Sequence, residues 1–209
     1  GIRPVGNLVH LLEAKGVRIY SLAHESREVD AFSFWWEERP FVFLNTVKSA
    51  ERSRFDAAHE LGHLVLHKHG APEGRVAEQE ADRFAAGFLL PKADVLGHAP
   101  RRATLLSVIA AKHRWGVSAL ALVHRLHALQ LVPEWHYRQL CIKLRMQYGS
   151  GEPEERQRET SQVLAKVFDA LRKSGVSRRQ VASTLRVSLR DLDELVFGLT
   201  LTTVKGAGS

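Results

Sequence analysis

The spacing of apolar residues along the chain changes from a strand pattern to a helical one near residue 50. Before that point, short runs rich in β-branched and aromatic residues predict strands at 17–22, 31–36 and 41–45, after a leucine-lined helix at 7–15. Beyond it, apolar residues recur with the helical period, which predicts helices at 53–69, 77–90, 104–114, 118–129, 178–185 and 189–195. The pattern predicts an α+β protein with a small antiparallel or mixed sheet and a mostly α-helical C-terminal half.

The strand predicted at 31–36 carries three aromatic residues at alternate positions. Phe32, Phe34 and Trp36 share one face of that strand, because side chains alternate between the two faces. Large aromatic residues in such a row most often pack into a core, so we expect this face to be buried. The residues after the strand, Glu37 to Pro40, predict a turn into the next strand.

Composition places the chain among ordinary globular proteins. Its 209 residues are 44% hydrophobic and 25% charged. The single cysteine, Cys141, has no partner for an internal disulfide, and the chain shows neither a membrane-spanning apolar run nor a signal-peptide layout at Gly1. These features predict a cytoplasmic protein.

The positive charge is concentrated in the middle of the chain. The formal net charge is +7, and residues 91–150 carry nine Lys and Arg against two Asp and Glu. Such a basic stretch is typical of a surface near nucleic acid or an acidic partner, and equally of solvated helix faces. The helix pair 104–129, joined by Trp115-Gly116-Val117-Ser118, has a helix-turn-helix layout. Lys112, Arg114 and Arg125 are the basic residues that this pair could offer to DNA.

The most informative motif is His59-Glu60-Leu61-Gly62-His63, within the helix predicted at 53–69. Residues four apart lie one above the other on a helix, so His59 and His63 can direct two imidazole nitrogens at one cation. This arrangement is typical of zinc peptidases, in which the glutamate of the motif, here Glu60, acts as the general base. Gly62, which lacks a side chain, would allow the sheet to approach this helix closely.

A catalytic zinc site needs a third protein ligand, and the next predicted helix supplies candidates. Glu78 and Asp82 are four residues apart and share a face, so Glu78 can complete the coordination while Asp82 accepts the second ring N–H of a ligand histidine. Glu80 is the competitor for the third position, but it lies about 200° around the helix from Glu78. We favour Glu78, because it alone has a carboxylate one turn further on.

A three-histidine site that also uses His69 is the alternative. That pattern requires a glycine at position 66, where the helix breaks, but the residue is Leu66. A continuing helix would place His69 about 15 Å along the axis from His59. We therefore expect His67 and His69 to face solvent. Zinc is the expected metal, although manganese(II) or iron(II) would accept the same His-His-Glu set.

The stretch from Phe41 to Pro91 resembles the ImmA/IrrE family of metallopeptidases. The residues that carry the resemblance are Arg54-Phe55, Ala58-His59-Glu60-Leu61-Gly62-His63, Glu78-x-x-Ala81-Asp82-x-Phe84-Ala85-Ala86 and Leu89-Leu90-Pro91. Asp82 stands where many members have asparagine, and Phe88 interrupts a run of small apolar residues. The resemblance implies a gluzincin-like site with Glu78 as the third ligand, and a sheet packed on the motif helix and the ligand helix.

The resemblance also implies a substrate and a domain organisation. Family members cleave helix-turn-helix repressors and so release genes for excision of mobile elements or for stress responses, and many carry an N-terminal helix-turn-helix domain, which we expect ahead of Gly1. The expected organisation is a zincin-like core at 1–95, a basic helical region at 96–148, a polar linker at 149–160 and a small helical region at 161–209.

Two other functions compete with the peptidase. One is a DNA-binding regulator with a non-catalytic metal site, which the basic middle region and the helix-turn-helix layouts suggest. The other is a toxin–antitoxin module that binds a partner protein without cutting it. The final helix pair offers little to DNA, since Asp191, Asp193 and Glu194 accompany Arg190.

Overall fold

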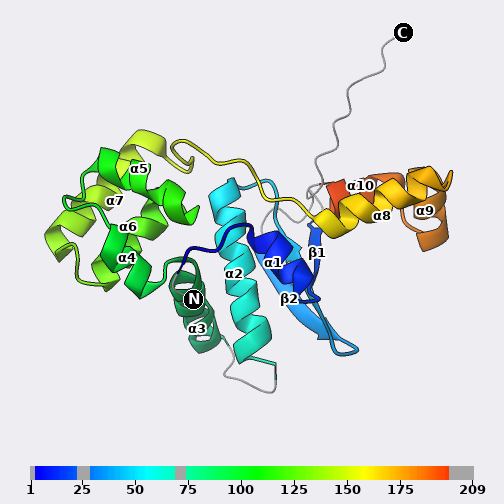
Figure 1. The fold of residues 1–209 in the computed structure, drawn as a ribbon, viewed down its shortest axis with the longest axis horizontal. Coiled ribbons are helices and arrows are strands. Elements are labelled where there is room, and N and C mark those ends of the chain that lie inside the picture. Colours follow the sequence, from blue (N-terminus) through cyan, green and yellow to red (C-terminus); the bar gives the residue numbers. More distant parts are fainter. Residues whose placement is uncertain (1–2, 23–28, 69–73, 198–209) are drawn as a thin grey trace, which may run out of the picture. The chain divides into compact units, whose positions relative to one another are not determined.

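We analysed a computed structural model, which describes residues 3–22, 29–68 and 74–197. Within these ranges the chain forms three strands and ten helices, and every element after β3 is a helix (Figure 1). The predicted α+β class and the mostly helical C-terminal half are confirmed. Among the described residues, no helix combines the length and the apolar content needed to cross a membrane.

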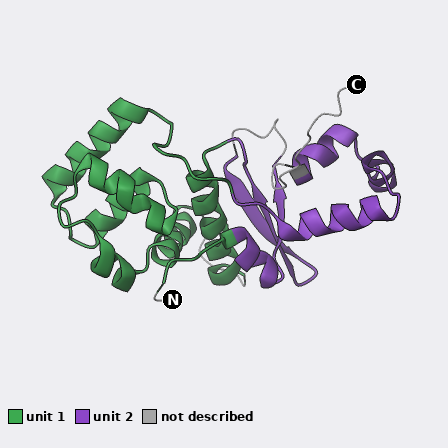
Figure 2. Ribbon diagram, turned by 45° about the horizontal axis from the view of Figure 1, so that its top comes forward, with its two compact units in different colours: residues 1–8, 48–158 green, residues 9–47, 159–209 purple. Residues whose placement is uncertain are grey.

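The chain folds into two compact units, each built from two separate stretches of sequence (Figure 2). Unit 1 comprises residues 1–8 and 48–158, and unit 2 comprises residues 9–47 and 159–209. The motif helix lies in unit 1 and the sheet in unit 2. The domain boundaries expected at residues 95, 148 and 160 stay a prediction.

The sheet of unit 2 has three strands in the order β1-β3-β2. β1 (Arg18–Ser21) runs parallel to β3 (Arg39–Leu44), and β2 (Ala31–Trp36) is antiparallel to β3, so the sheet is mixed. Glu37 and Glu38 connect β2 to β3 with positive φ angles of 46° and 58°. Such a two-residue turn matches the right-handed twist of a hairpin, and it lets β3 begin two residues earlier than predicted.

The expectation that the aromatic row of β2 is buried was wrong. Phe32, Phe34 and Trp36 are 41%, 40% and 62% exposed. They pack within the sheet instead: the ring centroids of Phe32 and Phe43 are 4.8 Å apart, and those of Phe34 and Phe41 are 5.3 Å apart. Alternation in the sequence identifies which side chains share a face, but not which face the protein covers.

Four helices complete unit 2, namely α1 (Leu8–Ala14), α8 (Gln162–Lys173), α9 (Arg178–Leu185) and α10 (Leu189–Phe197). Leu164, Ala182, Leu192 and Val196 form a small buried core among the last three helices, and Tyr20 of β1 packs against it. Glu13 of α1 accepts a hydrogen bond of 3.0 Å from the backbone N–H of Gln162, at the start of α8. This hydrogen bond joins the two stretches of sequence that make up unit 2.

Unit 1 is entirely helical within the described residues, and its elements are α2 (Ala50–Leu66), α3 (Arg75–Leu89), α4 (Lys92–His98), α5 (Leu105–Trp115), α6 (Ala119–Ala128) and α7 (Glu134–Tyr148). α2 begins and ends three residues earlier than predicted, because Ser49 caps it by accepting the backbone N–H of Arg52. α4 was not predicted: Pro91 ends α3 as expected but also stands as the N-cap residue of α4.

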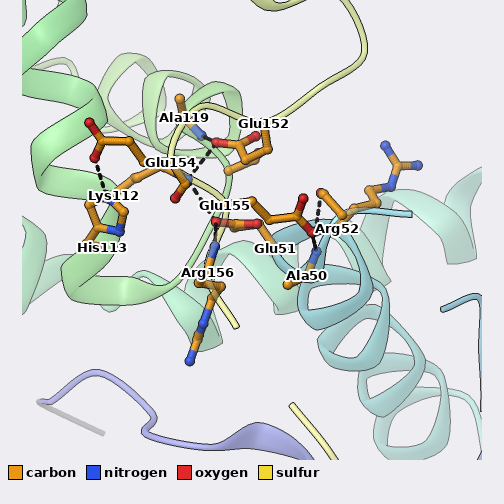
Figure 3. Close-up of polar contacts among 12 residues, drawn as sticks. Ala50, Glu51, Arg52, Lys112, His113, Ala119, Glu152, Glu154, Glu155 and Arg156 are labelled. Atoms are coloured by element: carbon orange, nitrogen blue, oxygen red, sulfur yellow. Dashed lines mark hydrogen bonds and ion pairs between the residues drawn. The ribbon is translucent and has the colours of Figure 1, made fainter. Parts of the chain in front are cut away.

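Residues 149–158 have no helix or strand, as predicted, but their carboxylates bind helix ends (Figure 3). Glu155 accepts the backbone N–H of Ala50 at 2.7 Å, and Glu152 accepts that of Ala119 at 2.8 Å. Lys112 lies between two carboxylates, with its Nζ 2.8 Å from Glu51 Oε1 and 3.0 Å from Glu152 Oε1. We call Lys112, Glu51 and Glu152 the Lys112 cluster.

Candidate metal centre

The candidate site lies where α2 and α3 pack against each other. A Cβ atom on Gly62 would lie only 3.1 Å from Ala81 Cα and 3.2 Å from Phe84 Cδ1, so a larger residue would push the helices apart. The close approach that we attributed to the sheet is thus made by α3. Ala81 is fully buried and lies between Glu78 and Asp82, so this contact sets both carboxylates opposite the motif histidines.

His59, His63 and Glu78, which we call the donor cluster, converge on one point. The Nε2 atoms of His59 and His63 are 3.0 Å apart. Glu78 Oε2 is 3.2 Å from His59 Nε2, and Glu78 Oε1 is 3.5 Å from His63 Nε2. Among the described residues, these three form the group whose donor atoms lie close enough together, all within 4.8 Å, to hold a metal ion.

Asp82 contacts the first histidine on the side away from this point. Its Oδ1 is 2.9 Å from His59 Nδ1. A carboxylate can only accept, so a neutral His59 that donates to Asp82 carries its ring proton on Nδ1. His59 Nε2 is then left with a lone pair directed at the donor cluster.

The second histidine has a corresponding partner, which sequence reasoning missed. His63 Nδ1 is 2.9 Å from His67 Nδ1, and His67 Nε2 is 3.1 Å from Glu80 Oε2. The side chain of His67 is 10% exposed, so the expectation that it faces solvent was wrong; His69 lies outside the described residues. Glu80, the rejected competitor for the third ligand, instead holds His67.

One set of ring protons serves the outer contacts of both histidines. Glu80 can only accept, so His67 carries its proton on Nε2 and offers a lone pair at Nδ1. His63 must then donate from Nδ1, which leaves a lone pair on its Nε2. Burial, followed by the neighbouring imidazole of His59, lowers the pKa of His63, which favours this neutral form.

With the ring protons on these outer nitrogens, the donor cluster brings together two imidazole lone pairs and a carboxylate. Two imidazole lone pairs and a carboxylate within 3.0–3.5 Å of one another repel unless a cation lies between them. The set of two histidines and one carboxylate matches catalytic zinc sites with three protein ligands, which keep a fourth position for water or substrate. The donor chemistry thus fits a divalent metal.

Glu60 lies on α2 between the two histidines and is not one of the three converging donors. Its side chain belongs to a residue only 6% exposed. Glu60 is thus a buried carboxylate that follows His59 directly in the sequence and lies outside the set of three converging donors.

The basic residues expected to offer a DNA-binding surface on α5 and α6 make internal contacts. Lys112 is completely buried in the Lys112 cluster. Arg114 makes two hydrogen bonds to Asp94, at 2.9 and 2.7 Å, and Arg125 Nε donates to Leu90 O at 3.0 Å. These contacts weigh against a role for the three side chains in neutralising phosphates.

Comparison with known families agrees with this geometry. The profile of the IrrE N-terminal-like domain, Peptidase_M78, matches residues 12–127, which is more than half of the chain. The chain belongs to this family. The match covers α2 and α3, and with them all three residues of the donor cluster. A search among proteins of curated function gives no match.

Membership of Peptidase_M78 bears on what the donor cluster could bind. The family is one of metallopeptidases, which implies a divalent metal, and His59, His63 and Glu78 form a possible site for it.

Proposed function

We propose that the protein is a zinc-dependent endopeptidase that hydrolyses a peptide bond in a helix-turn-helix transcriptional repressor and thereby relieves repression. The observation that carries the peptidase is the convergence of two imidazole lone pairs and the Glu78 carboxylate on one point of a Peptidase_M78 chain. The repressor as substrate rests on the resemblance to the ImmA/IrrE family.

His59, His63 and Glu78 would hold the metal. When bound, zinc would supply Lewis acidity, which lowers the pKa of water and polarises a carbonyl group. Asp82 and His67 keep the ring protons of the two ligand histidines on their outer nitrogens, so both inner nitrogens stay ready to ligate. Manganese(II) or iron(II) would suit the same three ligands.

Glu60 is the proposed general base. Its carboxylate would take a proton from the attacking water and then deliver that proton to the amine of the leaving peptide, so that it ends the cycle unprotonated. A site that only held metal for structural purposes would gain nothing from a buried glutamate between the two ligand histidines.

The test is to incubate the metal-loaded protein with the repressor encoded beside its gene and to identify products by mass spectrometry. Replacing Glu60→Gln should abolish cleavage while leaving the bound metal unchanged, because only the proton acceptor is lost. Glu134→Gln, a change on an exposed side chain of α7, is the matched control and should cleave like the wild type.

A single cut, made by the wild type and by the control, would support the peptidase and its substrate. Cleavage that persists at full rate with Glu60→Gln would remove Glu60 from the mechanism. An intact repressor in the presence of stoichiometric zinc, manganese(II) or iron(II) would instead favour a regulatory module that binds without cutting.

A further inference from the structure

A pocket of about 450 Å³ lies between α2, α3 and α6, all in unit 1. Its volume is within the range usual for ligand-binding sites. Phe55, Ala86, Leu120 and Ala121 provide apolar lining, and Arg52, Arg83 and Arg125 bring guanidinium groups to it.

The pocket adjoins the donor cluster. Asp82 is one of the residues that line the pocket, and its Oδ1 contacts His59 Nδ1 at 2.9 Å. Phe55 lies four residues before His59 on α2, and Ala86 four residues after Asp82 on α3, so the lining continues the metal-facing stripes of both helices by one turn. A peptide whose scissile bond lay at the donor cluster would therefore have a neighbouring side chain within reach of the pocket.

The charges around the pocket select among possible side chains. Three arginines line it against one carboxylate, that of Asp82, which His59 already engages. Arg52 forms an ion pair with Asp56 at 3.2 Å, but its side chain remains 55% exposed. Arg83 has no ion-pair partner among the residues that the structure describes, and it is exposed. The pocket thus combines an apolar lining with an excess of positive charge.

We propose that this pocket is a specificity subsite, which takes a large apolar side chain next to the scissile bond while the arginines bind acidic residues of the same substrate segment. The proposal rests on the proposed peptidase and narrows its substrates to segments in which Phe, Leu or a similar residue is flanked by Asp or Glu. Charge complementarity favours an acidic peptide over a basic one.

The test is to digest a library of proteome-derived peptides with the metal-loaded protein and to read the residues around each cut by mass spectrometry. We expect a large apolar residue beside the cut and Asp or Glu within a few residues of it. Arg83→Glu should lower kcat/KM for acid-flanked sites about fivefold and raise it for lysine-flanked sites, as expected for a partly exposed charge contact. Arg179→Glu, the same change on exposed α9, should alter neither.

A second variant tests the apolar lining. Ala121→Phe on α6 should fill the pocket and shift the preferred apolar residue towards smaller side chains, with bound metal unchanged. Cuts without acidic or apolar preference, or identical profiles for Arg83→Glu and Arg179→Glu, would overturn the subsite and leave the peptidase standing.

Absence of any cleavage by the metal-loaded wild type would count against the peptidase, and the subsite would then be judged by binding. A fluorescein-labelled peptide with Phe between Glu residues should bind the Glu60→Gln protein more tightly than its Lys-containing counterpart, and Arg83→Glu should remove the difference. Equal binding of both peptides would overturn the subsite. Binding of labelled duplex DNA that Arg83→Glu abolishes, without peptide binding, would assign the pocket to nucleic acid.

Discussion

Helix α2 contributes to two clusters of charged and polar residues that differ in one respect. At its N-terminal end, Glu51 belongs to the Lys112 cluster, where the side chains of Lys112 and Glu51 are each 1% exposed and a lysine ammonium lies between the carboxylates. Two turns further on, the donor cluster gathers acceptors around a point that no side-chain cation of the described residues fills, and Glu78 is 62% exposed. A cluster that contains its own cation is suited to holding the fold together, whereas one that lacks a cation is suited to binding a metal ion.

The largest effect is expected from removing the internal cation. Lys112→Met would leave two carboxylates buried without their partner, and breaking a buried ion pair in this way costs about 3–5 kcal/mol. Denaturant unfolding should show this loss in the free energy of unfolding. Lys143→Met, on exposed α7, is the control and should change stability by less than about 0.5 kcal/mol. A loss below 1 kcal/mol for Lys112→Met would mean that the cluster does not hold unit 1 together.

Removing a residue of the donor cluster should change metal affinity strongly and the stability of the metal-free protein little, the opposite of what is expected for Lys112→Met. His63→Ala deletes one of three metal ligands, so the dissociation constant for zinc should rise about 10²–10³-fold, while the metal-free protein should unfold at nearly the same denaturant concentration. Competition with a chromophoric chelator measures the affinity. His113→Ala, which lies outside the donor cluster, should bind zinc normally. Unchanged affinity in His63→Ala would place the metal elsewhere.

A smaller effect is expected one step further from the metal. His67→Leu removes the acceptor of His63 Nδ1, so zinc affinity should fall about 10–100-fold, as for other residues that orient metal-ligating histidines. His67→Gln should recover part of the loss, because its amide oxygen can accept from His63 while its NH₂ donates to Glu80. The same chelator competition distinguishes these cases. Equal losses in the leucine and glutamine variants would point to packing and not to proton placement.

The smallest effect is expected at Asp94 of α4. This residue lies outside the donor cluster, and its carboxylate accepts hydrogen bonds from side chains of the protein. Arg114, Trp115 and the nearby His98 surround its carboxylate, and the hydrogen bonds from Arg114 are the main cause of its lowered pKa. Asp94→Asn should lower the free energy of unfolding by about 1–2 kcal/mol at neutral pH. Chemical denaturation of the two proteins side by side gives this difference.

The pH dependence of that difference follows from the direction of the shift. A lowered pKa in the folded state means that the ionised carboxylate stabilises the fold above the unfolded value, near 3.9, and that this contribution is lost as the pH falls through the lower folded value. Wild type and Asp94→Asn should therefore differ by a constant amount above about pH 5 and converge below about pH 4. A constant difference down to pH 2 would contradict this account.

Local spacing made the donor cluster predictable. The interval of four residues between His59 and His63, and again between Glu78 and Asp82, sets each pair on one helical face. His67 continues the first series by one more turn, so its place beside His63 follows from the same spacing. The contact between Asp82 and His59 depends on the same local geometry, while the role of Asp82 in orienting a metal ligand stays a prediction.

Contacts between distant residues were not predictable in this way. Nothing near Lys112 in the sequence indicates that it is buried, because its partners Glu51 and Glu152 lie 61 and 40 positions away. The identity of the helix that approaches Gly62 and the exposure of the Phe32 face likewise depend on how elements pack. Pairing of β1 with β3 depends on a long connection, whereas the adjacent β2–β3 hairpin was readable from its turn.

The acidic segment at 149–158 has a consequence for the order in which the chain folds. Glu155 and Glu152 stabilise the first turns of α2 and α6, which are two walls of the pocket, and the first of these contacts spans 105 residues. During synthesis, α2 and α3 can pair soon after they emerge, since they are neighbours in sequence. The contact of Glu155 with Ala50 needs residue 155, so the donor cluster, which joins α2 and α3, can assemble before the walls of the pocket are complete.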